Sequence, residues 1–150
     1  MQLTKKETDL LQELKGQEKL CIEKYEKGEN CANDEQLKQL FSSIKEIEQQ
    51  HYNAVCAVMN GTTPPPSIPV NLNQTFSSTY NADETEQKKN DCYLCTDALS
   101  AEKHASHLYD TCVFEFKEDN LRNILNGIQK QEQEHGKLIY DYMSANSMYS

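Results

Sequence analysis

Glu48-Gln-Gln-His51 is repeated as Glu132-Gln-Glu-His135, 84 positions further along this 150-residue chain. Each copy is preceded, at the same distance, by a Glu-Lys pair, Glu18-Lys19 in the first half and Glu102-Lys103 in the second. In a helix, residues three apart share a face, and glutamate and histidine side chains are common metal ligands. The repeat therefore predicts two copies of a helical hairpin that carries metal-ligand chemistry.

The same offset relates further positions in the two halves without a gap. The paired residues are Leu10 and Leu94, Tyr25 and Tyr109, Leu37 and Leu121, Lys38 and Arg122, Leu40 and Ile124, Ile44 and Ile128, and Gln49 and Gln133. Any duplicated hairpin would repeat its apolar positions, because they form its core. Packing does not require that four glutamates and two histidines repeat as well.

The composition limits the classes of partner. The formal net charge of −9 argues against nucleic acid and against an anionic membrane surface as partners. No stretch approaches the roughly 18 uninterrupted apolar residues of a membrane span, and the beginning of the chain has no apolar leader segment. We expect residues 1–150 to form a single domain inside a cell, with the six cysteines present as thiols when the protein is made.

Residues 3–60 are predicted to form the first hairpin. Thr4-Lys-Lys-Glu7 is typical of a capping box at the start of a helix, and Gly28 is expected to end that helix. Asn33 or Asp34 would cap a second helix, which is expected to stop at Asn60-Gly61.

Residues 61–87 contain all four prolines of the chain and have no helical period, which indicates an extended crossover. The second hairpin, 88–145, would hold one helix from about 91 to 116 and another from about 119 to 143. The sequence therefore predicts an all-α fold, a four-helix bundle of two antiparallel hairpins joined by one long crossover. Hairpins exchanged between two chains would satisfy the same pattern.

The predicted hairpins bring the candidate ligands to one level. Glu18 and Glu48 are equally far in sequence from the first turn near Asn33, and Glu102 and Glu132 are equally far from the second turn near Lys117. The apolar stripes turn these carboxylates inward, because Glu48 follows Ile44 by one helical turn and Glu132 follows Ile128 in the same way.

Four buried carboxylates repel one another unless protons or cations neutralise them. Two divalent ions would neutralise four glutamates. Oxygen and imidazole ligands suit iron, manganese or zinc, and we favour two iron ions. The expected ligands are Glu18, Glu48, His51, Glu102, Glu132 and His135.

This ligand set resembles the di-metal site of the ferritin-like superfamily, which includes ferritins, bacterioferritins and rubrerythrins. The resemblance implies that Glu48 and Glu132 bridge the two metals and that Glu18 and Glu102 are terminal ligands. It also implies that Tyr25 and Tyr109, each two helical turns after a terminal glutamate, hydrogen-bond a ligand carboxylate of another helix.

The C-terminal half has a second, narrower resemblance. Glu102-Lys-His-Ala-Ser-His-Leu-Tyr109, Leu121-Arg122, the Glu132-x-x-His135 region and Tyr142-Met-Ser-Ala-Asn-Ser-Met-Tyr149 look like the Coat F family of spore coat proteins. That resemblance implies the mother-cell cytoplasm and then the coat of an endospore-forming bacterium as the setting.

Two functions stay open at this point. A di-iron centre would react with dioxygen or peroxide as an oxidase or a peroxidase. A structural coat protein would use the metal only as a staple, or would keep a vestigial site. A homodimer or other coat proteins are the partners that the second function implies.

The other candidate residues are interpreted as packing or surface residues. Cys92-x-x-Cys95 is read as packing in preference to a redox pair, although crosslinking in a coat stays open. His104 and His107 lie off the face set by Glu102, which predicts surface histidines.

Overall fold

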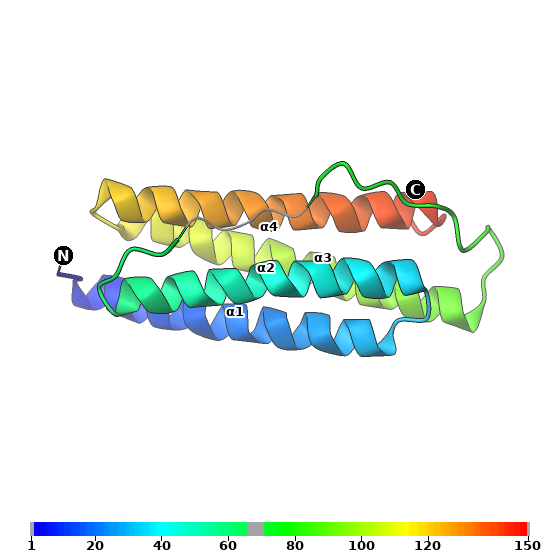
Figure 1. Cartoon of the computed structure of the whole chain (residues 1–150), viewed down its shortest axis with the longest axis horizontal. Helices are drawn as coiled ribbons and strands as arrows, with labels where there is room; N and C mark the ends of the chain where they lie inside the picture. Colours follow the sequence, from blue (N-terminus) through cyan, green and yellow to red (C-terminus); the bar gives the residue numbers. More distant parts are fainter. Residues whose placement is uncertain (1, 66–70, 150) are drawn as a thin grey trace.

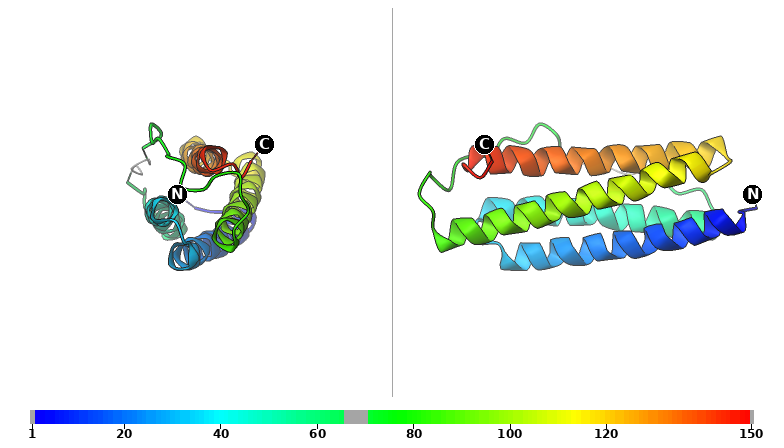
Figure 2. Two further views of the ribbon diagram at one scale, coloured as in Figure 1. Left: turned by 90° about the vertical axis from the view of Figure 1, so that its right-hand side faces the viewer. Right: turned by 180° about the vertical axis from the view of Figure 1, so that it is seen from behind.

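The computed structural model describes residues 2–65 and 71–149, and in these ranges it contains four helices and no strand. They are α1 (Lys5–Cys31), α2 (Glu35–Met59), α3 (Glu86–Glu115) and α4 (Asp119–Ala145). The helices lie along one common direction (Figure 1), and seen end-on they occupy the four corners of a bundle (Figure 2). The predicted all-α bundle of two hairpins is confirmed.

The two hairpins pack through specific pairs of helices. α1 packs on α2 and α3 on α4, while the hairpins meet mainly through α1 with α3 and less closely through α2 with α4. The carboxylate of Asp91, near the start of α3, accepts hydrogen bonds from the backbone N–H groups of Asn33 and Asp34 at 2.8 and 2.9 Å. Both α2 and α3 therefore start at the same end of the bundle, so the crossover between them must run its full length.

The end of the crossover is fastened over the seam between α2 and α4. Gln36 of α2 accepts a hydrogen bond from the backbone N–H of Ser77 at 2.8 Å, and Asn146, just after α4, accepts from Thr79 at 2.8 Å. The ring of Phe76 meets Tyr142 of α4 edge-on, with ring centroids 5.7 Å apart. The crossover was predicted over residues 61–87, and Pro66 to Val70 in its proline-rich part lie outside the described residues.

Two predicted helix boundaries were wrong. α3 begins at Glu86 and not near Asp91, because the Thr85 hydroxyl accepts a hydrogen bond from Lys88 N–H at 3.1 Å and caps a first turn that is mostly polar. α1 continues through Gly28 to Cys31, where the Ala32 N–H bonds the Gly28 carbonyl. Of the two proposed caps for α2, Asp34 is the one that accepts a hydrogen bond from Gln36 N–H.

Gly28 serves helix packing and not helix termination. A Cβ atom at this position would lie 3.0 Å from two ring carbons of Phe41 on α2. Phe41 is buried and also contacts Tyr25, with ring centroids 5.5 Å apart. The missing side chain thus lets the ring rest against the α1 backbone.

The apolar core has two parts, one toward each end of the bundle. One cluster contains Tyr25, Ala32, Leu37, Leu40, Phe41, Ile44, Cys95, Ala98, Leu138, Ile139, Tyr142 and Met143. The other contains Leu11, Leu14, Val55, Val58, Tyr109, Cys112, Phe116, Leu121, Leu125 and Ile128. Between the positions of these clusters along the helices lie the six candidate ligands.

Substituting Gly28 by alanine is expected to destabilise the protein. Alanine favours a helix over glycine by about 0.5–1 kcal/mol, whereas forcing the Phe41 ring to move in a packed core costs about 1–3 kcal/mol. Gly16→Ala in the same helix is the matched control, because nothing lies within 4 Å of its added Cβ atom. Urea unfolding should show a lower free energy of unfolding for Gly28→Ala and a slightly higher one for Gly16→Ala. Equal stabilisation by both would contradict the packing role.

Candidate metal centre

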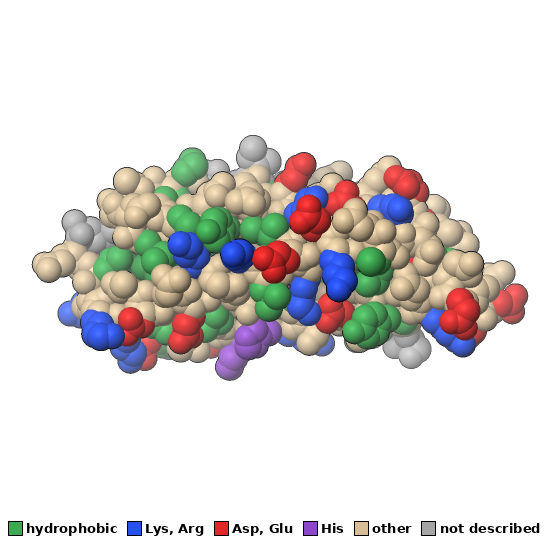
Figure 3. All heavy atoms as spheres, turned by 90° about the horizontal axis from the view of Figure 1, so that it is seen from below, with side chains coloured by type: hydrophobic (Ala, Val, Ile, Leu, Met, Phe, Trp, Pro, Cys, Tyr) green, Lys and Arg blue, Asp and Glu red, His purple; other side chains and the backbone are tan. Residues whose placement is uncertain are grey.

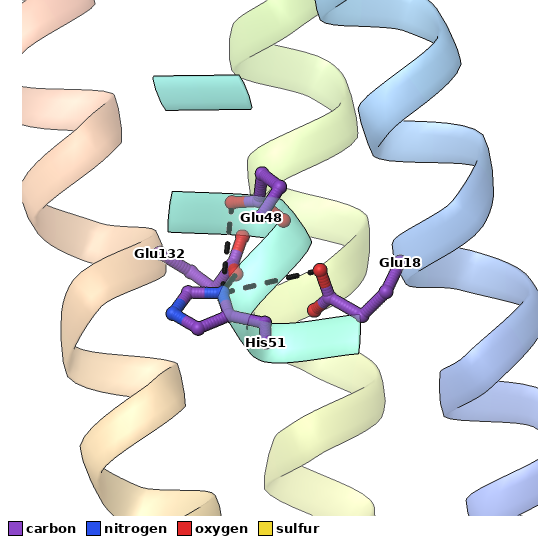
Figure 4. A group of neighbouring side chains, drawn as sticks. All are labelled: Glu18, Glu48, His51 and Glu132. Atoms are coloured by element: carbon purple, nitrogen blue, oxygen red, sulfur yellow. Dashed lines mark hydrogen bonds and ion pairs between the residues drawn. The ribbon is translucent and has the colours of Figure 1, made fainter. Parts of the chain in front are cut away.

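All six candidate ligands point into the middle of the bundle. Glu18 comes from α1, Glu48 and His51 from α2, Glu102 from α3, and Glu132 and His135 from α4. None is more than 3% exposed. Figure 4 shows three carboxylates from three helices that converge on one nitrogen of His51. The apolar stripes predicted this direction correctly, since Ile44 and Ile128 are buried one turn before Glu48 and Glu132.

The ligand atoms form two overlapping groups. Glu18, Glu48, His51 and Glu132 each offer one atom within 4.8 Å of the others, and so do Glu48, Glu102, Glu132 and His135. Glu48 and Glu132 belong to both groups. These buried groups could bind a metal ion, and two neighbouring positions would share the two carboxylates.

Each imidazole lies close to a shared glutamate of the other hairpin. His51 Nδ1 is 2.8 Å from Glu132 Oε1, and His135 Nδ1 is 2.9 Å from Glu48 Oε1. The sequence repeat relates the members of one pair to those of the other, so the duplication is also present in the geometry of the site. The contact between His135 and Glu48 is short but does not have the geometry of a hydrogen bond, so His135 Nδ1 has no hydrogen-bond partner.

Buried polar atoms without hydrogen-bond partners are concentrated here. Within the described ranges such atoms belong only to the candidate ligands: Glu18 Oε2, both carboxylate oxygens of Glu48, Glu102 Oε2, Glu132 Oε2 and both ring nitrogens of His135. Buried polar groups are nearly always satisfied, and leaving one unpaired costs roughly 1–3 kcal/mol. Carboxylate oxygens that face one another in a buried space without protein donors are an arrangement that cations satisfy.

Two buried tyrosines hold the carboxyl groups of Glu102 and Glu18 across the hairpin interface. Tyr25 of α1 donates to Glu102 Oε1 of α3 at 2.5 Å, and Tyr109 of α3 donates to Glu18 Oε1 of α1 at 2.7 Å. Burial, with the neighbouring carboxylates, raises the pKa of both phenols well above the usual value, so both keep their protons. Each tyrosine leaves one oxygen of its carboxylate free to bind an ion.

Gln131 is a site residue that the sequence analysis missed. The His51 Nε2–H donates to its side-chain oxygen at 2.5 Å. In the neutral imidazole this bond places the lone pair on Nδ1, the nitrogen that faces the carboxylates. The duplication could not reveal Gln131, because the equivalent position in the first half is Ile47.

The pKa values of the carboxyl groups are split by burial and mutual repulsion. Burial raises the pKa of Glu18 and of Glu132, and neighbouring carboxylates raise both further. Burial opposes ionisation of Glu48 too, but the neighbouring Glu18 carboxyl and the imidazoles of His135 and His51 outweigh it and hold its pKa well below the usual value. Burial lowers the pKa of His135, but Glu102 and Glu48 outweigh it and raise the value to about 10.

The other titratable candidates lie outside this cluster. The Cys95 thiol is buried, which raises its pKa, and Cys92 is only half-buried. A thiol with a raised pKa is a poor nucleophile, which favours the packing role. His104 and His107 are exposed, as predicted. Figure 3 shows exposed histidine atoms at the lower edge of that view.

Residues 90–150 match the Coat F domain family. The match covers most of α3, all of α4 and the C-terminal residues, and it includes Glu102, Tyr109, Glu132 and His135. It does not include Glu18, Tyr25, Glu48 or His51 in the first hairpin. Searches of curated proteins and of solved structures find no match to this chain. Within the described residues, no helix is long and apolar enough to cross a membrane.

The metal-free protein is expected to lose stability as the pH rises. Glu18, Glu132 and His135 have raised pKa values, so their contributions are complete below the unfolded-state pKa and are lost as the pH rises through the folded-state pKa. Glu48 has the opposite sign, but its contribution is already complete above about pH 5. Each proton retained only by the folded state gives a loss of about 1.4 kcal/mol per pH unit.

Urea unfolding in a chelating buffer at pH 5, 7 and 9 would measure this dependence. Glu132→Gln keeps the shape of the side chain and removes one titrating group, so its stability should fall less steeply than that of the wild type. A wild-type stability that rises between pH 5 and 9, or the same slope in both proteins, would contradict the assignment.

Proposed function

We propose that this protein binds two divalent metal ions between its hairpins and that the bound ions are iron. The observation that carries the proposal is the pair of overlapping ligand groups, which share Glu48 and Glu132. The charges support the same stoichiometry, since two divalent ions balance four carboxylates. This ligand set, in a bundle with one long crossover, is the arrangement of ferritin-like di-metal carboxylate proteins.

The donor set fits iron or manganese well. Each group offers three carboxylates and one imidazole, which suits iron and manganese, and zinc is the alternative that imidazole also allows. The unpartnered oxygens of Glu18, Glu48, Glu102 and Glu132 would become ligands, with Glu48 and Glu132 as bridges. When bound, iron would supply redox chemistry with dioxygen or peroxide.

The chain's own residues would set the geometry and the access of water. Tyr25 and Tyr109 fix the orientation of Glu102 and Glu18 before any ion arrives, and Gln131 fixes the tautomer of His51. The two apolar clusters on either side restrict water along the bundle axis. Because both tyrosines keep their protons, they can stabilise charge on a carboxylate without competing for the metal.

The match to the Coat F domain supports a role in the coat of a bacterial spore. We propose that the protein is made in the mother-cell cytoplasm and associates with other coat proteins or with itself. A bundle with a metal site would then be one component of that coat.

The same match favours a second candidate function, a structural coat protein. In that case the metal would join the two hairpins as a staple and would have no open coordination position. The two functions differ in one measurable property. A redox centre oxidises ferrous iron when oxygen is supplied, and a staple binds metal without turning over.

The protein purified without added metal should contain about two iron or manganese atoms per chain by inductively coupled plasma mass spectrometry. Glu48→Gln/Glu132→Gln should lose both, because both positions use these carboxylates. Glu46→Gln/Glu134→Gln makes the same charge change beside the site, outside the ligand groups, and should keep the wild-type content.

Reconstitution with ferrous iron under air would follow. Rapid oxidation in the wild type and in the control pair supports the redox function, and bound but unreactive metal supports the staple. A folded wild-type protein that takes up neither iron nor manganese would overturn the metal proposal.

Tyr25→Phe should weaken metal binding without unfolding the protein. It removes the hydrogen bond to Glu102, and the loss of such an outer partner lowers metal affinity by about 10- to 100-fold. Calorimetric titration with Mn²⁺ would measure the change, with Tyr140→Phe on the exposed side of α4 as the control. Unchanged affinity in Tyr25→Phe would remove the positioning role of this phenol.

A further inference from the structure

An open groove of about 500 Å³ lies between α3 and α4 and reaches two of the candidate ligands. Its lining includes Glu102 and Glu132 together with Leu99, Ser106, Gln129 and Gly136. The Gln129 amide donates to the Ser106 carbonyl at 3.0 Å and links the two walls. This groove connects the surface with the middle of the bundle.

The lining of the groove differs from the equivalent positions of the first hairpin. At the equivalent positions the first hairpin has Ile22 where the second has Ser106, and Tyr52 where the second has Gly136. Both larger side chains are half-buried. The two halves of the site are therefore related in their ligands but differ in the side chains that cover them.

The two ligand carboxylates that line the groove are almost as deeply buried as the other two. Glu18 and Glu48, on the α1–α2 side, are 0% exposed. Glu102 and Glu132, on the groove side, keep 3% and 1%. Each of these two carboxylates also keeps one buried oxygen, Oε2, without a hydrogen-bond partner. The groove thus reaches two residues that each hold a buried acceptor oxygen without a donor.

The charge of the groove favours cations. Its acidic lining residues are Glu102, Asp110 and Glu132, and its basic lining residues are Lys103 and His107. A concave surface with an excess of carboxylates attracts divalent cations and raises their rate of association.

We propose that the α3–α4 groove is the entrance through which a hydrated divalent cation reaches the buried carboxylates, and that Gly136 and Ser106 keep it open. The inference rests on the proposed metal site and adds that the site is loaded from one side of the bundle. Gly136 and Ser106 bind no ion in this scheme. They act by the size of their side chains.

Filling the groove should slow metal loading without changing the amount of metal bound. Gly136→Leu places a side chain in the groove, whereas Gly136→Ala adds a Cβ atom only 3.8 Å from Leu99, an ordinary contact. Tyr52→Leu changes the equivalent position on the α1–α2 side. Stopped-flow absorbance with Co²⁺ as the probe would give loading rates, and mass spectrometry after long incubation would give stoichiometry.

The loading rate of Gly136→Leu should fall by about tenfold or more, which corresponds to a barrier about 1.4 kcal/mol higher, at wild-type stoichiometry. Gly136→Ala and Tyr52→Leu should stay within about twofold of the wild type. If Gly136→Leu does not fold, Ser106→Leu on the opposite wall is the second variant with the same expected result.

The outcomes distinguish a failure of the entrance proposal from a failure of the metal-site proposal. Wild-type loading rates in folded Gly136→Leu or Ser106→Leu, or slow loading in Tyr52→Leu alone, would overturn the entrance while leaving the metal site intact. Absence of a Co²⁺ signal in the wild-type protein would overturn the metal site, and the entrance with it.

Discussion

Mutual repulsion among four buried carboxylates is the constraint on which the rest of this structure depends. Glu18, Glu48, Glu102 and Glu132 lie in the middle of an otherwise apolar bundle, and burial strengthens every interaction between their charges. The split pKa values show how the metal-free protein meets this constraint, by keeping protons on some of these groups. The same arrangement makes the site receptive to cations, because binding replaces protons with charges that satisfy more lone pairs at once.

The surrounding fold holds these charges in place. Tyr25 and Tyr109 each donate a hydrogen bond to a carboxyl group of the other hairpin. Glu102 and Glu18 are therefore oriented only when the two hairpins are packed together. The hydrogen bonds that hold the crossover to α2 and to the end of α4 cover the seam between these two helices. The site is therefore a product of the complete bundle and not of either hairpin, although the Coat F match covers only the second hairpin and its C-terminal residues.

The number of helices, their pairing and the convergence of the six candidate ligands could be predicted because each rests on periodicity. An apolar stripe with the period of the α-helix fixes which face is inward, and the constant offset between the halves fixes which residues are equivalent. The features that could not be predicted depend on contacts between distant residues or lie in polar segments without an apolar period. Gly28 has the local signature of a helix end, but its role is set by the Phe41 ring. Thr85 caps α3 about two turns before the first apolar residue, Cys92, so the apolar period does not reveal this start. The residue equivalent to Gln131 in the first half is Ile47, so a comparison of the two halves does not identify Gln131 as a site residue.

Gln131 has a consequence for the two proposed metal positions. A symmetric pair of identical hairpins would have to make both positions the same, whereas a duplication within one chain allows them to diverge. Here the Gln131 side chain holds Nε2 of His51 by a hydrogen bond. Nε2 of His135 has no such partner, and the residue equivalent to Gln131 in the first half is Ile47. Two ions bound in this bundle would therefore be chemically unequal, with different affinities and, for iron, different reduction potentials.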